Sequence, residues 1–74
     1  MSPRQPVVSG KALVRALEQD GWSVVRQRGS HLRLKKPGRR HALVVPLHKE
    51  LKKGTLAGIL RDAGMSADRL RDLL

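Results

Sequence analysis

Three short runs with the residue types of β-strands occupy the middle of the chain, and they limit the fold more than any other feature. They read "WSVVRQR", "HLRLK" and "HALVV", and the breaks between them are Gly29-Ser30 and "KPGRR". Valine-rich or alternating runs between such breaks are typical of strands joined by turns. The sequence therefore predicts a three-stranded antiparallel meander.

The second run alternates strictly between apolar and polar residues. Side chains on a strand point to opposite faces in turn, so Leu32 and Leu34 should face a core. The polar side chains of the run should face the other way, toward solvent or a ligand: His31, Arg33 and Lys35.

Helices are predicted on both sides of the three runs. Ser9 can cap a first helix whose apolar face includes Leu13 and Leu17, and Gly21 should close it. Pro46 should end the third strand, because proline cannot donate to a sheet ladder. The sequence "TLAGILRDAG" follows with the spacing of a buried helical stripe and a terminal glycine.

Ser66 can cap a short last helix, with Leu70, Leu73 and Leu74 as its apolar stripe. The predicted class is α+β, in the order α-β-β-β-α plus a short C-terminal helix. Helices on one face of an antiparallel sheet leave the other face open. We expect a flexible N-terminal segment over residues 1–8 and a single domain over residues 9–74.

Charge points to a polyanionic partner. The 74 residues carry 16 Lys and Arg against 6 Asp and Glu, a net charge of +10, and no acidic residue lies between Gly21 and Lys49. Nucleic acid is the commonest partner of such a block. The chain has no cysteine and no apolar run near the roughly 20 residues that a membrane span needs. We expect a cytoplasmic protein that contacts no membrane.

The candidate RNA-binding residues are the cations of this block, the serine beside the glycine, and two lysines before the second helix: Arg26, Arg28, Ser30, Arg33, Lys35, Lys36, Arg39, Arg40, Lys52 and Lys53. Trp22 is the only aromatic residue and is expected in the core. Without aromatic stacking, phosphate contacts should dominate binding, which predicts strong salt dependence and weak sequence preference.

His31 follows Gly29-Ser30 directly and is the candidate catalytic residue. The three histidines lack metal-ligand spacing, and no carboxylate lies in the block to join them, so neither a metal nor another cofactor is expected. RNA cleavage needs no metal when the substrate's own 2′-hydroxyl is the nucleophile and a histidine helps to remove its proton. Gly29 allows an unusual backbone angle that could aim His31. From these residues alone, His31 is equally well a passive polar contact.

The residues "SGKALVRALEQDGWSVVRQRGSHLRL", followed by "VVPLHKELKKGTLAGILRDAGMS", resemble the HicA toxin family, also called YcfA-like, of bacterial toxin-antitoxin systems. The resemblance runs from about Ser9 to Ser66 and rests on the "GW" step, the "QRGSH" motif and the "KKGTL" entry to the second helix. It implies a fold like that of double-stranded-RNA-binding domains, ribosome-independent cleavage of mRNA and a HicB-type antitoxin that covers the active face.

In this resemblance the catalytic histidine falls on His31, and a recurrent Pro-x-His places a secondary candidate at His48. His41 is expected to be a solvated residue at a strand end. The alternative is a non-catalytic RNA-binding module that uses the same face. A DNA-binding regulator is disfavoured, because neither predicted helix is basic enough to read a groove.

Overall fold

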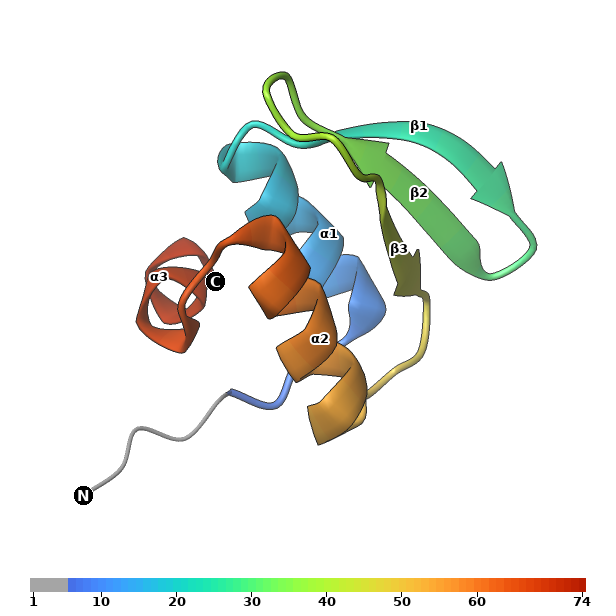
Figure 1. Ribbon diagram of the computed structural model, residues 1–74. Coiled ribbons are helices and arrows are strands. Elements are labelled where there is room, and N and C mark those ends of the chain that lie inside the picture. The colour runs from blue at the N-terminus through green and yellow to red at the C-terminus, as the bar shows by residue number, and fades with distance from the viewer. Residues whose placement is uncertain (1–5) are drawn as a thin grey trace.

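The structure, a computed structural model, describes residues 6–74 and has three helices and one three-stranded antiparallel sheet (Figure 1). In chain order the elements are α1 (Gly10–Gln19), β1 (Ser23–Arg28), β2 (His31–Lys35), β3 (Leu43–Pro46), α2 (Lys53–Ala63) and α3 (Ala67–Leu73). This order confirms the predicted α+β class, a fold like that of double-stranded-RNA-binding domains with a short helix added at the C-terminal end.

Helix α1 begins where the sequence predicts. The Ser9 hydroxyl accepts a hydrogen bond from the backbone N–H of Ala12 at 3.0 Å, which caps the first turn. The helix ends at Gln19, and Gly21 has a φ of 98°, a backbone angle that favours glycine. Leu13 and Leu17 lie fully buried on the face that packs against the sheet.

The sheet has the order β1-β2-β3, so β2 is central and the other two strands are edges. Leu34 in β2 pairs with Val24 in β1 and with Leu43 in β3. Between Val24 and Arg26 the register of β1 shifts by one residue, which makes Val25 a β-bulge. A bulge places two residues of one strand opposite one of its neighbour and re-aims the side chains that follow.

The helices pack on one face of the sheet, as predicted (Figure 1). Helix α1 contacts β1 and β3, α2 contacts β3, and α3 contacts α1. Gly64 ends α2 in the left-handed conformation, and the Ser66 hydroxyl caps α3 by accepting from the N–H of Arg69 at 3.0 Å. Helix α2 begins at Lys53, one of the two lysines expected to precede it.

The core lies between the sheet and the helices and confirms Trp22 as a core residue, 2% exposed. Leu70 of α3 is fully buried there and Leu73 is partly buried. Leu74 was expected on the same stripe, but it is 53% exposed because α3 ends at Leu73 and the last residue leaves the helical face.

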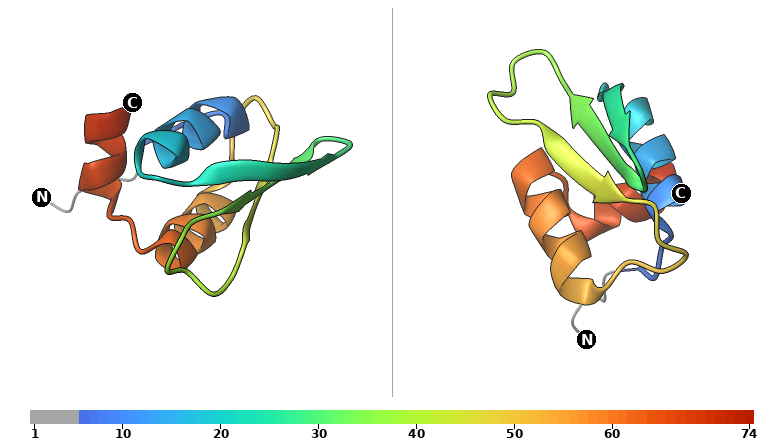
Figure 2. Two further views of the ribbon diagram at one scale, coloured as in Figure 1. Left: turned by 90° about the horizontal axis from the view of Figure 1, so that it is seen from above. Right: turned by 90° about the vertical axis from the view of Figure 1, so that its right-hand side faces the viewer.

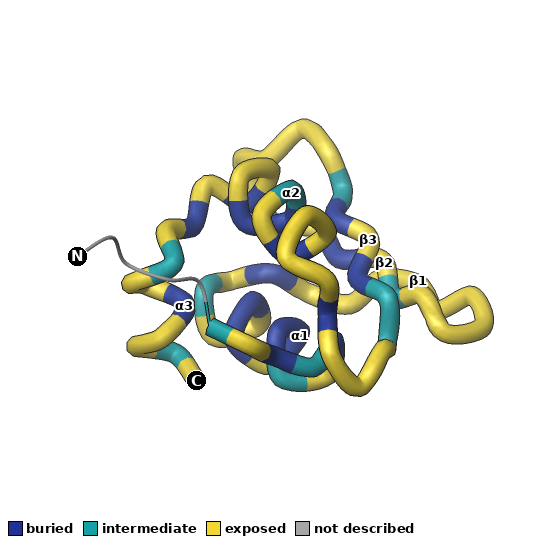
Figure 3. Tube along the Cα trace, turned by 90° about the horizontal axis from the view of Figure 1, so that it is seen from below, coloured by how far each residue is buried: buried dark blue, intermediate teal, exposed yellow. Residues whose placement is uncertain are grey.

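The β1–β2 hairpin extends past the helices (Figure 2), and the end of this hairpin is exposed over its whole length (Figure 3). Within residues 6–74, no helix has both the length and the apolar character needed to cross a membrane.

At the N-terminal end, Val8 is buried and its carbonyl accepts a hydrogen bond from the N–H of Leu51 at 2.8 Å. Val8 therefore belongs to the packed domain. The expected flexibility of the N-terminal segment stays a prediction, since residues 1–5 lie outside the described residues.

Gly10 gives a test of how α1 is joined to the sheet. A Cβ atom at Gly10 would lie 1.9 Å from the carbonyl oxygen of Pro46, a backbone atom that cannot rotate away. We expect Gly10→Ala to lower the free energy of unfolding by about 1–3 kcal/mol, as overpacking does. Gly58→Ala is the control, because its Cβ would meet only the end of Arg61 at 3.9 Å and should stabilise α2 by about 0.5–1 kcal/mol. Urea unfolding measures both, and equal stability of the two variants would contradict the close contact.

Candidate functional site

The register of the three strands brings the candidate site residues together in two rows on the open face. One row is Arg28, His31 and Pro46, and the next is Arg26, Arg33 and Val44. Directly opposite residues in an antiparallel pair share a face, so each row points away from the helices. The bulge at Val25 is what allows Val24 to face the core while Arg26 and Arg28 both face out.

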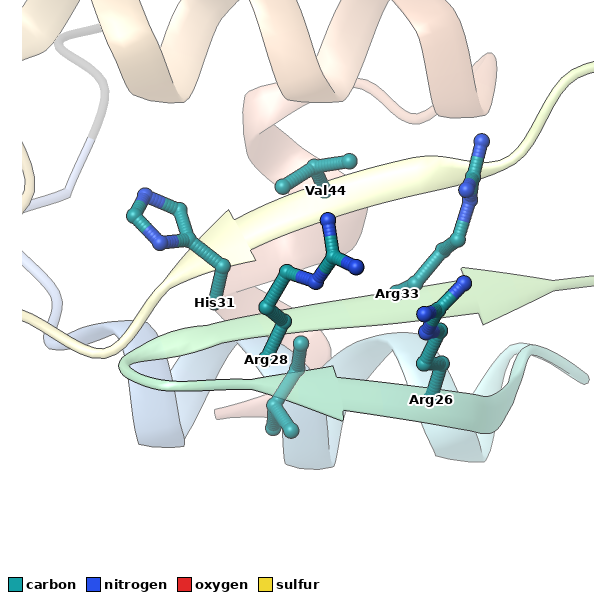
Figure 4. Close-up of a pocket in the computed structure, with 6 residues that line it drawn as sticks. Arg26, Arg28, His31, Arg33 and Val44 are labelled. Carbon is teal, nitrogen blue, oxygen red and sulfur yellow. The ribbon is translucent and has the colours of Figure 1, made fainter.

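These side chains surround a shallow hollow of about 140 Å³. Figure 4 shows side chains from all three strands around it: Arg26 and Arg28 from β1, His31 and Arg33 from β2, and Val44 from β3. Leu32 completes the lining. The hollow is smaller than the roughly 300–1,000 Å³ typical of small-molecule pockets, so it suits one group of a larger ligand.

The turn before His31 is fixed by its backbone. Gly29 has a φ of 58°, and no described non-glycine residue has a positive φ, so Ser30 does not. A positive φ at only the first turn residue is the pattern of a type II′ hairpin, which favours glycine there. This confirms the unusual backbone angle expected at Gly29.

Two hydrogen bonds hold this turn. The side-chain amide of Gln27 donates to the carbonyl of Gly29 at 3.1 Å, and the N–H of Leu47 donates to the carbonyl of Ser30 at 2.7 Å. The Ser30 side chain is exposed beside the pocket, outside its lining. His31 is therefore positioned by a short loop that is tied to the chain on both sides.

The pocket is electropositive and contains no acidic side chain. Arg26, Arg28 and Arg33 make no ion pair or side-chain hydrogen bond with any of residues 6–74. Three guanidinium groups around one hollow create a positive potential there, which favours a bound anion. The arrangement is therefore suited to a phosphate.

Two of the predicted RNA-binding cations also make contacts that hold the fold, and their contact with RNA stays a prediction. Lys36 forms an ion pair with Asp20 at 3.3 Å, at the end of α1. Arg39 donates to the carbonyl of Ala63 at 3.1 Å, at the end of α2. Both contacts attach the β2–β3 loop to the helices, away from the pocket.

The remaining predicted residues are exposed and do not line the pocket. Lys35 continues the open face beyond Arg33, since it pairs with Ser23 in the next outward row. Arg40 and His41 lie in the β2–β3 loop, His48 in the loop after β3, and Lys52 and Lys53 at the start of α2. Over the described part of the chain, no three His, Cys, Asp or Glu side chains come together as a metal site would need.

Sequence reasoning missed Val44, Pro46 and Gln27. Val44 and Pro46 border His31 and Arg33 on the open face, and Gln27 holds the turn. The run "HALVV" gives no polar/apolar alternation to mark Val44, and its outward direction follows only from the burial of Leu43 and Val45 in the structure.

A family model described as the HicA toxin of bacterial toxin-antitoxin systems matches residues 10–65. The chain belongs to the HicA toxin family. The match confirms the resemblance found in the sequence, and it ends at Met65, before α3.

A solved structure supports the same assignment. It is a chain of a toxin-antitoxin complex from Streptococcus pneumoniae with 37% sequence identity and a TM-score of 0.68. The similarity covers 78% of this chain and 98% of that chain. A search of curated proteins found no match.

Gly29→Ala tests the turn that positions His31. A Cβ atom there has nothing within 4 Å, so any cost comes from the positive φ and not from crowding. We expect a loss of about 1–2 kcal/mol in the free energy of unfolding. Gly54→Ala, also without neighbours and lacking a positive φ, should cost nothing. Thermal unfolding compares the two, and a Gly29→Ala variant as stable as the wild type would rule out the left-handed turn.

Proposed function

We propose that this chain is the toxin of a type II toxin-antitoxin pair and that it cleaves RNA without the ribosome, with His31 as the proton-transfer group. The observation that carries the proposal is the position of His31, opposite Arg28 and in one pocket with three arginines that have no partner among residues 6–74. Family membership supports a toxin, and the pocket supports the chemistry.

The proposed reaction uses the groups that line the pocket. The 2′-oxygen of one nucleotide attacks the adjacent phosphorus, so that a new 2′-O–P bond forms and the P–O5′ bond breaks. The imidazole of His31 accepts the proton of the 2′-hydroxyl, and the 5′-oxygen leaves with a proton supplied by the returning imidazolium or by water. The products are a 2′,3′-cyclic phosphate and a 5′-hydroxyl.

The arginines supply the electrostatic part of the proposed reaction. Negative charge grows on the phosphorane oxygens in the transition state, and fixed guanidinium groups stabilise it there. Arg28 lies opposite His31, so a phosphate between them contacts both the imidazole that acts as general base and a cation. Arg26 and Arg33 form the next row. They are placed to contact either the next phosphate along the RNA or the far side of the phosphate that lies between Arg28 and His31.

The structure supports RNA contact unequally for the remaining predicted cations. Lys35 lies on the same open face and is proposed as a further phosphate contact. Arg40, Lys52 and Lys53 are exposed beyond the pocket, and their contact with RNA stays a prediction, as does the secondary role of His48. A non-catalytic RNA-binding module uses the same arginines, and only cleavage separates it from the toxin.

An antitoxin partner is part of the proposal. We propose a HicB-type protein that presents acidic groups to the arginine-lined face, because opposite potentials speed association. Such a partner and RNA would occupy the same surface and exclude each other. A stable ternary complex with RNA still bound in the pocket would contradict this arrangement.

His31→Ala is the decisive variant for the proposed reaction. We expect cleavage of a labelled RNA to fall by roughly 10²–10⁴-fold, the usual contribution of a general base, while affinity for RNA stays within a few-fold. His41→Ala is the matched control, since His41 is exposed and lies outside the pocket. His48→Ala, in the same assay, tests the secondary candidate.

Substrate and chelator controls separate chemistry from binding. An RNA with a 2′-deoxy nucleotide at the cleaved position should bind but remain intact, because it lacks the nucleophile. Cleavage should persist in EDTA, since the proposed step uses the imidazole, the 2′-hydroxyl and the arginines but no metal ion. Equal cleavage by the wild type and His31→Ala would end the catalytic proposal, and binding without any cleavage would favour the module.

Salt dependence tests the arginines. For single-stranded RNA, the slope of log affinity against log salt changes by about 0.7 for each phosphate that the protein neutralises. Arg28→Gln should reduce the slope by about that amount. Arg61→Gln removes the same charge from an 82% exposed side chain on α2 and should leave the slope unchanged. A uniform response of both variants would mean that net charge, and not the pocket, binds RNA.

A further inference from the structure

The open face of the sheet is divided into a cationic side and an apolar side. The outward positions of β1 and β2 in the two rows are three arginines and His31, whereas the outward positions of β3 are Val44 and Pro46. Val44 is 49% exposed, and it lines the pocket. A valine side chain carries no charge and no hydrogen-bond donor. An exposed valine at the edge of a site suited to phosphate therefore has no role in binding the phosphate itself.

Val44 lies close to the reacting group. It is directly opposite Arg33 and diagonal to His31, which pairs with Pro46 two residues further along β3. Diagonal neighbours in an antiparallel pair are about 7–8 Å apart. Figure 4 shows Val44 between His31 and Arg33, with the guanidinium of Arg28 turned toward it. The apolar surface therefore adjoins the catalytic position within the width of one nucleotide.

We propose, on the basis of the function proposed above, that the pocket holds one unpaired nucleotide of RNA, its phosphate over the arginines of β1 and β2 and its base against Val44. The hollow of about 140 Å³ takes one group of this unit, and the exposed face around the hollow carries the rest. A base in a duplex is covered on both sides by its stacked neighbours and cannot lie against a side chain in this way.

The composition of the chain explains why a valine has this position. RNA-binding sheets commonly stack bases on aromatic residues, but the only aromatic residue here is Trp22, which is 2% exposed. The base therefore meets a small apolar surface and not a stacking platform. Val44 is a contact residue for the base, and it sets how strongly the site holds that base.

The test adds the missing platform. Val44→Tyr, made in a His31→Ala background to prevent cleavage, should bind a short labelled oligouridylate roughly tenfold more tightly, since aromatic stacking of one base is commonly worth that much or more. Val44→Phe provides the same readout if the tyrosine variant folds poorly. Val24→Tyr is the matched control, because Val24 pairs with Leu34 and lies on the opposite face of the same sheet.

A blunt RNA duplex is the second probe. We expect no gain for the duplex with Val44→Tyr, and no gain for either probe with Val24→Tyr. Unchanged affinity of both aromatic variants at position 44, or an equal gain for the duplex, would overturn the inference. Cleavage by the wild type that depends on His31, together with no gain from Val44→Tyr, would leave the proposed function standing and remove only the base contact. A gain in affinity for the oligouridylate from Val44→Tyr, together with no cleavage by the wild type, would support the base contact and remove the proposed catalytic function.

Discussion

The central strand β2 sets the direction of every side chain in the pocket. Leu34 is fully buried, and its place in the core fixes the phase of the strand. A rotation that brought Arg33 inward would bury a guanidinium without a partner and expose a leucine, and both changes cost free energy. His31 therefore points outward because Leu34 points inward. Both neighbouring strands are aligned on this one, so the arginines of β1 and the valine of β3 depend on the same buried leucine.

The positive charge of the chain is divided between two uses. Asp20 pairs with Lys36 at 3.3 Å and with Arg69 at 3.7 Å, so one carboxylate ties α1, the end of β2 and α3 together. Arg39 joins the β2–β3 loop to the end of α2. The pocket arginines have no such partners within residues 6–74, so three like charges face one hollow without a neutralising group. Sites that break a local rule of this kind are commonly functional.

Much of this arrangement could be predicted from the sequence, because it depends on local rules. The caps at Ser9 and Ser66 and the alternation of "HLRLK" are each decided by residues a few positions apart. The bulge at Val25 could not be predicted, since "VVRQR" fits either phase until its partner strand is known.

The interactions of Lys36 and Arg39 could not be predicted from the sequence either. Their partners lie 16 and 24 residues away in the chain, and only the packed helices bring them near. The pocket could be predicted only in part, because contacts between distant parts of the chain are not visible in the sequence. The sequence identified the histidine and the arginines, while Val44 joins them only through the pairing of β3 with β2.

The close approach of Gly10 to Pro46 gives the two sides of the pocket different stiffness. On the β3 side, the N–H of Gly10 donates to the carbonyl of His48 at 2.9 Å, and there is no room for even a methyl group between α1 and the strand. On the other side, β1 is an edge strand in a hairpin that extends past the helices (Figure 2). Thermal motion should therefore displace the arginines of β1 relative to the valine, and hardly move the valine relative to α1. The width of the pocket, and with it the fit of the RNA that we propose as its ligand, therefore depends mainly on the hairpin side.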